Sequence, residues 1–177
     1  MPRYVQQRDE FRCGAVGIVN ALKWTGCKVT AKLIPRLCEE MHTTAQHGTQ
    51  AYELGRALAR RSCGMFSVRR DDHTSLRKIE AHLRDGMAVL VAYSHDGQSH
   101  NLNKDGEKWW HFAFITSVSE SGLTFRVANY RSNDKKKCAR QMIRRHTLRN
   151  HLRRHTSYGE WCDPLAWYLT KCPTEAR

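Results

Sequence analysis

Apolar residues recur at helical spacing near the start of the chain. Val16, Val19 and Leu22 fall three residues apart, so one apolar face runs through residues 13–27. Gly26 is a suitable residue to stop such a helix. The pattern therefore predicts a first helix over residues 13–27.

The same spacing predicts three further helices, over residues 30–41, 48–61 and 74–85. Thr30 can cap the first of these, although Pro35 lies inside its pattern. The apolar faces of the other two consist of Leu54, Ala57 and Leu58, and of Leu76, Ile79 and Leu83, and Gly86 follows as a C-terminal stop.

After Gly86 the pattern changes to that of strands. Residues 87–93 form a continuous apolar run, and residues 111–118 and 123–128 are rich in β-forming residues on either side of a turn at 120–122. Residues 94–108 are polar and are expected to form a loop. Further on, residues 141–155 return to a helical pattern, and residues 161–169 fit a strand or a short helix.

This order of elements predicts an α+β fold. We expect an N-terminal helical part packed on an antiparallel β-sheet, with a cleft between the two layers. The length of 177 residues fits a single domain over 1–177.

Composition narrows the class of protein. Hydrophobic residues make up 40% of the chain, which is ordinary for a soluble globular protein. No apolar run approaches the roughly 18 residues of a membrane span, and residues 1–10 lack the apolar stretch of a signal peptide. We therefore expect no membrane span and an intracellular, cytoplasmic location.

The seven cysteines favour the same compartment. Their number is odd and no two have CxxC spacing, which argues against a disulfide framework and against a structural zinc site. We expect reduced thiols and no bound metal.

The formal net charge is +13, from 30 Lys and Arg against 17 Asp and Glu. Much of the excess lies in a predicted basic helical segment at about 135–155. Two interpretations stay open: a solvated face, or a surface that binds phosphates of nucleic acid or an acidic protein. The cations in question are Lys135, Lys136, Lys137, Arg140, Arg144, Arg145, Arg149, Arg153 and Arg154.

One cysteine has the sequence context of a nucleophile. Cys13 stands where a loop passes into the first predicted helix, and the positive end of a helix lowers the pKa of a thiol. Gly14 next to it allows close approach of a substrate backbone. Gln7 offers a side-chain amide that can join the Cys13 N–H in stabilising an oxyanion.

A cysteine nucleophile needs a base, and the base needs a group that orients it. His111 begins one predicted strand and Asn129 ends the next, so a hairpin between them brings the two residues together. The Asn129 side chain is then able to hold the imidazole. Trp110, directly before His111, is expected either to pack in the core or to form a wall of the substrate groove.

In this order of features the chain resembles the C39-like peptidases of the papain-like superfamily. The resemblance runs from Val5 to about Asn129 and includes Gln7 six residues before Cys13, and Gly48-Thr49 before a helix. It implies a papain-like fold, with Cys13 as nucleophile and His111 as general base and acid. Asn129 would orient the imidazole and Gln7 would donate to the oxyanion.

Two departures from the family pattern stand out. The third member of its triad is more often Asp followed by Pro, whereas this chain has Asn129-Tyr130. Gln6 precedes Gln7, which leaves Gln6 open as an alternative oxyanion donor. The resemblance also leaves the substrate open.

Structural interpretations compete with each of these roles. Cys13 fits a small buried core residue, and His111 fits a hydrogen-bonded histidine at a strand edge. His95 and His100, in the polar loop, are rival bases.

Two functions follow. The first is a thiol hydrolase that cleaves a peptide or isopeptide bond, with deamidation or acyl transfer open to the same residues. The second is an inactive papain-like scaffold that serves as a basic binding protein in a virus particle or ribonucleoprotein. Neither requires a cofactor.

Overall fold

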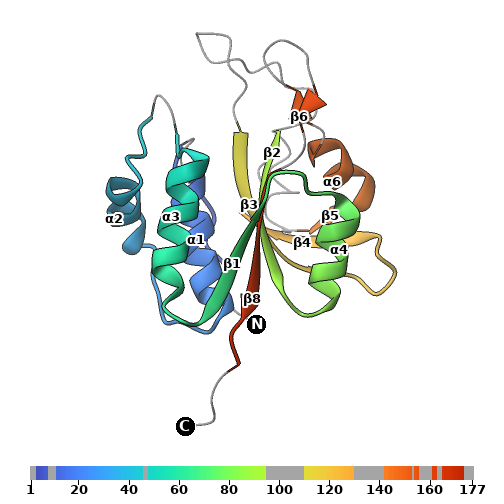
Figure 1. Cartoon of the computed structure of the whole chain (residues 1–177), viewed down its shortest axis with the longest axis horizontal. Coiled ribbons are helices and arrows are strands. Elements are labelled where there is room, and N and C mark those ends of the chain that lie inside the picture. The colour runs from blue at the N-terminus through green and yellow to red at the C-terminus, as the bar shows by residue number, and fades with distance from the viewer. Residues whose placement is uncertain are drawn as a thin grey trace.

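The computed structural model describes residues 3–7, 11–45, 48–94, 110–129, 142–152, 154–155, 161–162 and 165–173. A six-stranded antiparallel sheet stands at its centre, with α1, α2 and α3 on one face and α4 and α6 on the other (Figure 1). The helices are α1 (Cys13–Trp24), α2 (Leu33–Glu40), α3 (Ala51–Ser62), α4 (Leu76–Arg84) and α6 (Arg145–Leu152). The strands are β1 (Phe66–Asp71), β2 (Ala88–Ser94), β3 (Trp110–Val118), β4 (Thr124–Ala128), β5 (Met142–Arg144), β6 (Arg154–His155), β7 (Trp161–Cys162) and β8 (Ala166–Lys171). Among the described helices, none has both the length and the apolar character needed to cross a membrane.

The sheet has the strand order β1-β8-β2-β3-β4-β5, and β6 pairs with β7 separately. The last strand of the sheet in sequence, β8, therefore lies between β1 and β2. Its side chains are buried on both faces: Trp167 and Leu169 pack with α1 to α3, and Ala166 and Tyr168 pack with α4 and α6. A strand covered on both faces is apolar at successive positions, and Ala166–Leu169 follow that rule.

Helix α1 is the central helix of its layer. Ten of its residues are buried, from Cys13 to Leu22, so it contacts neighbours all round. Gly17 lets it approach the sheet closely, because a Cβ at this position would lie 2.8 Å from Leu90 Cδ1 in β2. The N-terminus of α1 is thus held at a fixed place relative to β2 and β3.

The glycines that were predicted to stop helices do so. Gly26 and Gly86 have φ of 94° and 75°, the left-handed conformation that glycine adopts without strain. After each, the chain makes the paired backbone hydrogen bonds of a Schellman motif, such as Cys27 N to Leu22 O at 3.1 Å. The second helix is shorter than predicted, and Pro35 lies in its first turn, where no intrahelical N–H is needed.

The helix predicted over residues 141–155 is confirmed at Arg145–Leu152 and wrong at the ends of that range. Met142–Arg144 form strand β5, because they pair with Thr124–Arg126 of β4, and only Arg145–Leu152 are helical. Strand β1 was not predicted, since its sequence FSVRRD carries three charges on a surface strand. The alternative left open for residues 161–169 is decided in favour of a strand from Ala166 onward.

Candidate active site

Cys13 is the first residue of α1 and is only 4% exposed. The carbonyl oxygen of Arg12 accepts the first helical hydrogen bond, from Val16 N at 3.0 Å. The N–H groups of the first turn therefore belong to the positive end of α1, next to the Cys13 thiol.

Gly14 is packed against the segment that precedes α3. A Cβ on Gly14 would lie 2.6 Å from Thr49 Cγ2, and the Thr49 hydroxyl hydrogen-bonds to that of Thr43 at 2.9 Å. Glycine is needed here for the packing of α1 on Gly48-Thr49, which explains why the two features occur together. The role of Gly14 in substrate approach stays a prediction.

His111 is the second residue of β3 and is 4% exposed. Its Nε2 lies 2.6 Å from the main-chain oxygen of Asn129. A carbonyl oxygen accepts hydrogen bonds and never donates them, so Nε2 must carry the hydrogen. In the neutral ring the basic nitrogen is then Nδ1.

Asn129 follows the last residue of β4 and is 2% exposed. Its side-chain Nδ2 donates to Gln7 Oε1 at 3.3 Å and to Phe112 O at 3.4 Å, and its Oδ1 accepts from Gln7 N at 2.9 Å. The sequence predicts the Asn129 side chain as the group that orients the imidazole, and this role stays a prediction. The hydrogen bond described above uses the main-chain carbonyl, and the side chain bonds to Gln7 and Phe112.

The backbone of Asn129 accounts for this arrangement. Its φ of 60° lies in the left-handed region, which Asn tolerates better than most residues other than glycine. A left-handed residue ends the strand and breaks its alternation. The carbonyl of Asn129 thereby bonds to His111, and its side chain bonds to Gln7.

Gln7 belongs to residues 3–7, which we call the N-terminal strap. The strap is held at Val5 by the fully buried Asn20 of α1: Val5 N donates to Asn20 Oδ1 at 2.7 Å, and Asn20 Nδ2 donates to Val5 O at 3.0 Å. It is held again at Gln7 by Asn129. Both contacts fix Gln7 relative to α1 and β4.

Asn20 was missed by sequence reasoning, although a signal for it exists. It is a polar residue between Val19 and Ala21 on a helix that is otherwise apolar there. The contact with Asn129 belongs to Gln7, whereas the Gln6 side-chain nitrogen is buried with no hydrogen-bond partner in the described part of the chain.

Several predicted residues fall outside what the structure describes. This applies to His95, His100, Trp109, Tyr130 and the side chain of Trp110, and to Lys135, Lys136, Lys137, Arg140 and Arg153. Of the predicted cations that are described with their side chains, Arg144 and Arg149 are exposed and Arg145 forms an ion pair with Glu80. Within the described ranges, no three His, Cys, Asp or Glu side chains converge as metal ligands would.

Comparison with known proteins gives the same fold from independent examples. No family model matches the chain, and no curated protein sequence matches it. Among solved structures, the peptidase domain of Streptococcus ComA, a bifunctional ABC transporter involved in quorum sensing, superposes with a TM-score of 0.58 at 18% identity, covering 96% of this chain and 99% of that domain.

Two further structures agree. A C39-like peptidase from Bacillus anthracis has a TM-score of 0.60 at 11% identity, covering 96% of this chain and 94% of its own. A double-glycine-motif protease from an AMS/PCAT transporter, solved with a leader peptide, has a TM-score of 0.56 at 10% identity, covering 97% and 92%.

Proposed function

We propose that this chain, whose fold is that of the C39 papain-like peptidase domains, is a cysteine hydrolase that cleaves an amide bond in a polypeptide. One observation carries the proposal: His111, Asn129 and Gln7 are joined by hydrogen bonds although they come from β3, the end of β4 and the N-terminal strap. The solved neighbours are peptidase domains, and one was crystallised with a leader peptide, which supports a polypeptide as the substrate.

Cys13 is the nucleophile in this proposal. The positive end of α1 stabilises its thiolate, and His111 Nδ1 accepts the thiol proton because Nε2 is engaged by the Asn129 carbonyl. The sulfur attacks the carbonyl carbon of the substrate. As the C–N bond breaks, His111 returns the proton to the leaving amine, and water then hydrolyses the thioester.

Gln7 is the side-chain donor to the oxyanion. Its Oε1 accepts from Asn129 Nδ2, so the NH2 group of the same amide is directed away from Asn129. Together with the Cys13 N–H, this NH2 would stabilise the negative charge that forms on the substrate oxygen. Asn129 then has two roles, one for the base and one for the oxyanion donor.

Selective alkylation tests the nucleophile. At about pH 6, where an ordinary thiol is almost fully protonated, iodoacetamide should label Cys13 fastest. If exposure alone set the rate of alkylation, Cys63 would react before Cys13, because Cys63 is exposed whereas Cys13 is buried. Labelled positions are read by peptide mass spectrometry.

The base is tested in the same assay. His111→Ala should remove the rate advantage of Cys13, and the exposed His146→Ala serves as the matched control with an unchanged rate. If Cys63 reacts first in the unaltered protein, the hydrolase proposal fails and the alternative of an inactive binding scaffold takes its place. Product masses from peptide and glutamine-containing substrates separate cleavage from deamidation.

A further inference from the structure

A concave site lies at the start of β4, away from Asn129. It has a volume of about 520 Å³ and is lined by Leu123, Thr124, Arg144, Arg145, His146 and Arg149. We call it the basic pocket. Thr124 and Asn129 lie five residues apart along one strand and its end, which corresponds to about 17 Å at roughly 3.3 Å per residue. The basic pocket is therefore distinct from the candidate active site.

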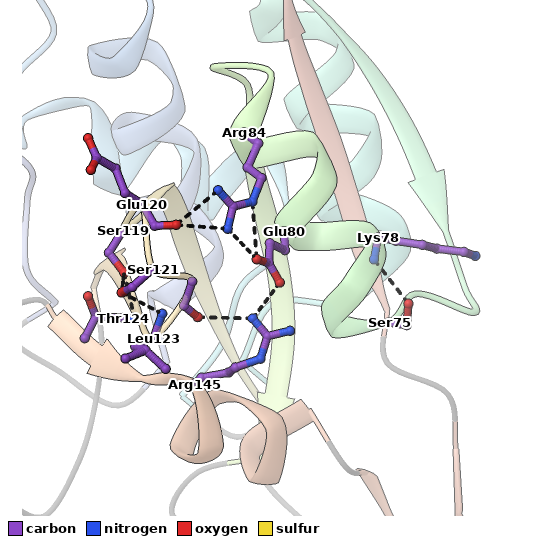
Figure 2. Close-up of polar contacts among 11 residues, drawn as sticks. Ser75, Lys78, Glu80, Arg84, Ser119, Glu120, Ser121, Leu123, Thr124 and Arg145 are labelled. Carbon is purple, nitrogen blue, oxygen red and sulfur yellow. Dashed lines mark hydrogen bonds and ion pairs between the residues drawn. The ribbon is translucent and has the colours of Figure 1, made fainter.

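One wall of the basic pocket is fixed by ionic contacts between α4, α6 and the β3–β4 turn. Figure 2 shows Glu80 between two arginines: Arg145 Nη1 lies 2.5 Å from Glu80 Oε2, and Arg84 Nη2 lies 2.8 Å from Glu80 Oε1. The same guanidinium groups donate to the turn, Arg145 to Gly122 O at 3.1 Å and Arg84 to Glu120 O at 3.4 Å.

Gly122 is required in this wall. Its φ is 70°, and a Cβ there would lie 2.8 Å from Glu80 Oε1. Hydrogen bonds from Arg84 and Arg145 lower the pKa of Glu80, so its carboxylate stays ionised at neutral pH. Glu80 thus offsets one of the two positive charges that Arg84 and Arg145 carry.

The remaining cations of the basic pocket face solvent. Arg144 and Arg149 are exposed, and neither has an acidic partner within the part of the chain that the structure describes. Leu123, in the same lining, is 63% exposed. An exposed leucine beside two exposed guanidinium groups suits a ligand that carries both an apolar group and negative charge.

We infer that the basic pocket binds an acidic segment of a polypeptide, with its carboxylates at Arg144 and Arg149 and an apolar side chain against Leu123. A nucleic acid fits less well, because its phosphate backbone carries no aliphatic side chain to pack against the exposed Leu123.

The position of the basic pocket also gives the bound segment a role. About five extended residues span the length of β4. A polypeptide held at Cys13 therefore needs at least about five extended residues between the cleaved bond and an acidic stretch bound in the basic pocket. This last step rests on the proposed function, whereas the binding itself does not.

Binding is measured without turnover, on the Cys13→Ala protein, by fluorescence anisotropy. The probe is a labelled short peptide in which Glu and Leu alternate, and its matched control has Gln in place of each Glu. Arg144→Gln/Arg149→Gln should weaken binding of the Glu peptide about tenfold at low salt, from two exposed ion pairs. Lys32→Gln/Arg36→Gln removes the same charge from the other face of the sheet and should leave binding within about twofold.

Three results would overturn the inference. They are equal binding of the Glu and Gln peptides, an unchanged affinity in Arg144→Gln/Arg149→Gln, and tighter binding of a single-stranded oligonucleotide that the same variant abolishes. Leu123→Ser should also lower the affinity for the Glu peptide. An unchanged affinity in this variant would contradict the contact between Leu123 and an apolar side chain of the peptide. If Cys13 is labelled selectively but the peptide does not bind, the inference about the basic pocket is wrong and the proposed function stands. If the peptide binds but Cys13 is not labelled selectively, the proposed function is wrong and the inference about the basic pocket stands.

Discussion

At the scale of single residues, Asn129 joins His111, the proposed base, to Gln7, the proposed oxyanion donor. Its main-chain oxygen accepts from His111 and its amide bonds to Gln7. The sequence was sufficient to predict that a hairpin brings His111 and Asn129 together. It was not sufficient to predict which atoms meet, because that depends on the left-handed φ of Asn129, which no hydrophobic pattern encodes.

Asn129→Gly separates the two roles of this residue. Glycine adopts the φ of 60° without strain and retains the main-chain carbonyl, but it removes the amide that orients Gln7. We expect alkylation of Cys13 to stay within about twofold, while kcat/KM falls at least tenfold, as when an oxyanion donor is lost.

The control is Asn129→Ala, which has the same loss of the amide and adds backbone strain at positive φ. If Asn129→Gly lowers the alkylation rate as much as kcat/KM, the carbonyl does not orient the imidazole by itself and the assignment of roles is wrong.

At the scale of elements, the N-terminal strap depends on α1 for its position. Four helices and three strands follow from periodicity and from glycine stops, because local sequence decides them. The strap, by contrast, has no periodic pattern. Its place is set by the side chain of Asn20, fifteen residues away in sequence from Val5, so only the folded chain reveals it.

Asn20→Leu should detach the strap. It removes both hydrogen bonds to Val5 and leaves the half-buried N–H and C=O of Val5 unpaired, which costs about 2 kcal/mol of unfolding free energy. Because Gln7 loses one of its two restraints, kcat should fall more than the rate of Cys13 alkylation.

Urea unfolding and single-turnover kinetics measure the two effects. The exposed Asn150→Leu in α6 is the matched control, with little change expected in either. An Asn20→Leu protein with full kcat would show that Gln7 is positioned by Asn129 alone.

At the scale of the whole molecule, the two layers of helices are joined through the sheet. The sequence was sufficient for the α+β class and for helices packed on antiparallel strands. The sequence was not sufficient to predict the strand order. Strand β8 pairs with β1 and β2, which lie far from it in the sequence, and local patterns carry no information about such pairing. The same holds for β5, whose strand conformation comes from pairing with β4.

His82 links global stability to pH through this packing. It lies against Tyr168 of β8, with its Nε2 at 3.1 Å from Leu169 O, and burial lowers its pKa from the ordinary value of 6.5. Below about pH 6.5 the unfolded chain therefore binds a proton that the folded chain resists. The contribution of His82 to the free energy of unfolding is fully present above this pH. It is lost as the pH falls through the lower pKa that His82 has in the folded protein.

His82→Gln should flatten this part of the stability profile. Urea unfolding at pH values on either side of 6.5 measures it, and exposed His146→Gln should leave the slope unchanged. A steeper dependence in His82→Gln than in the unaltered protein would contradict the sign of the effect.

Because β8 lies between β1 and β2, the sheet can be completed only after this late segment of the chain has been synthesised. Strand β1 leaves the ribosome about a hundred residues before β8, and β2 about eighty residues before it, by the separations of Phe66 and Ala88 from Ala166 in the sequence. Until Ala166–Lys171 arrive, both strands present unpaired edges that can pair with other chains. Translation that stops before Ala166 therefore leaves a sheet with two open strand edges.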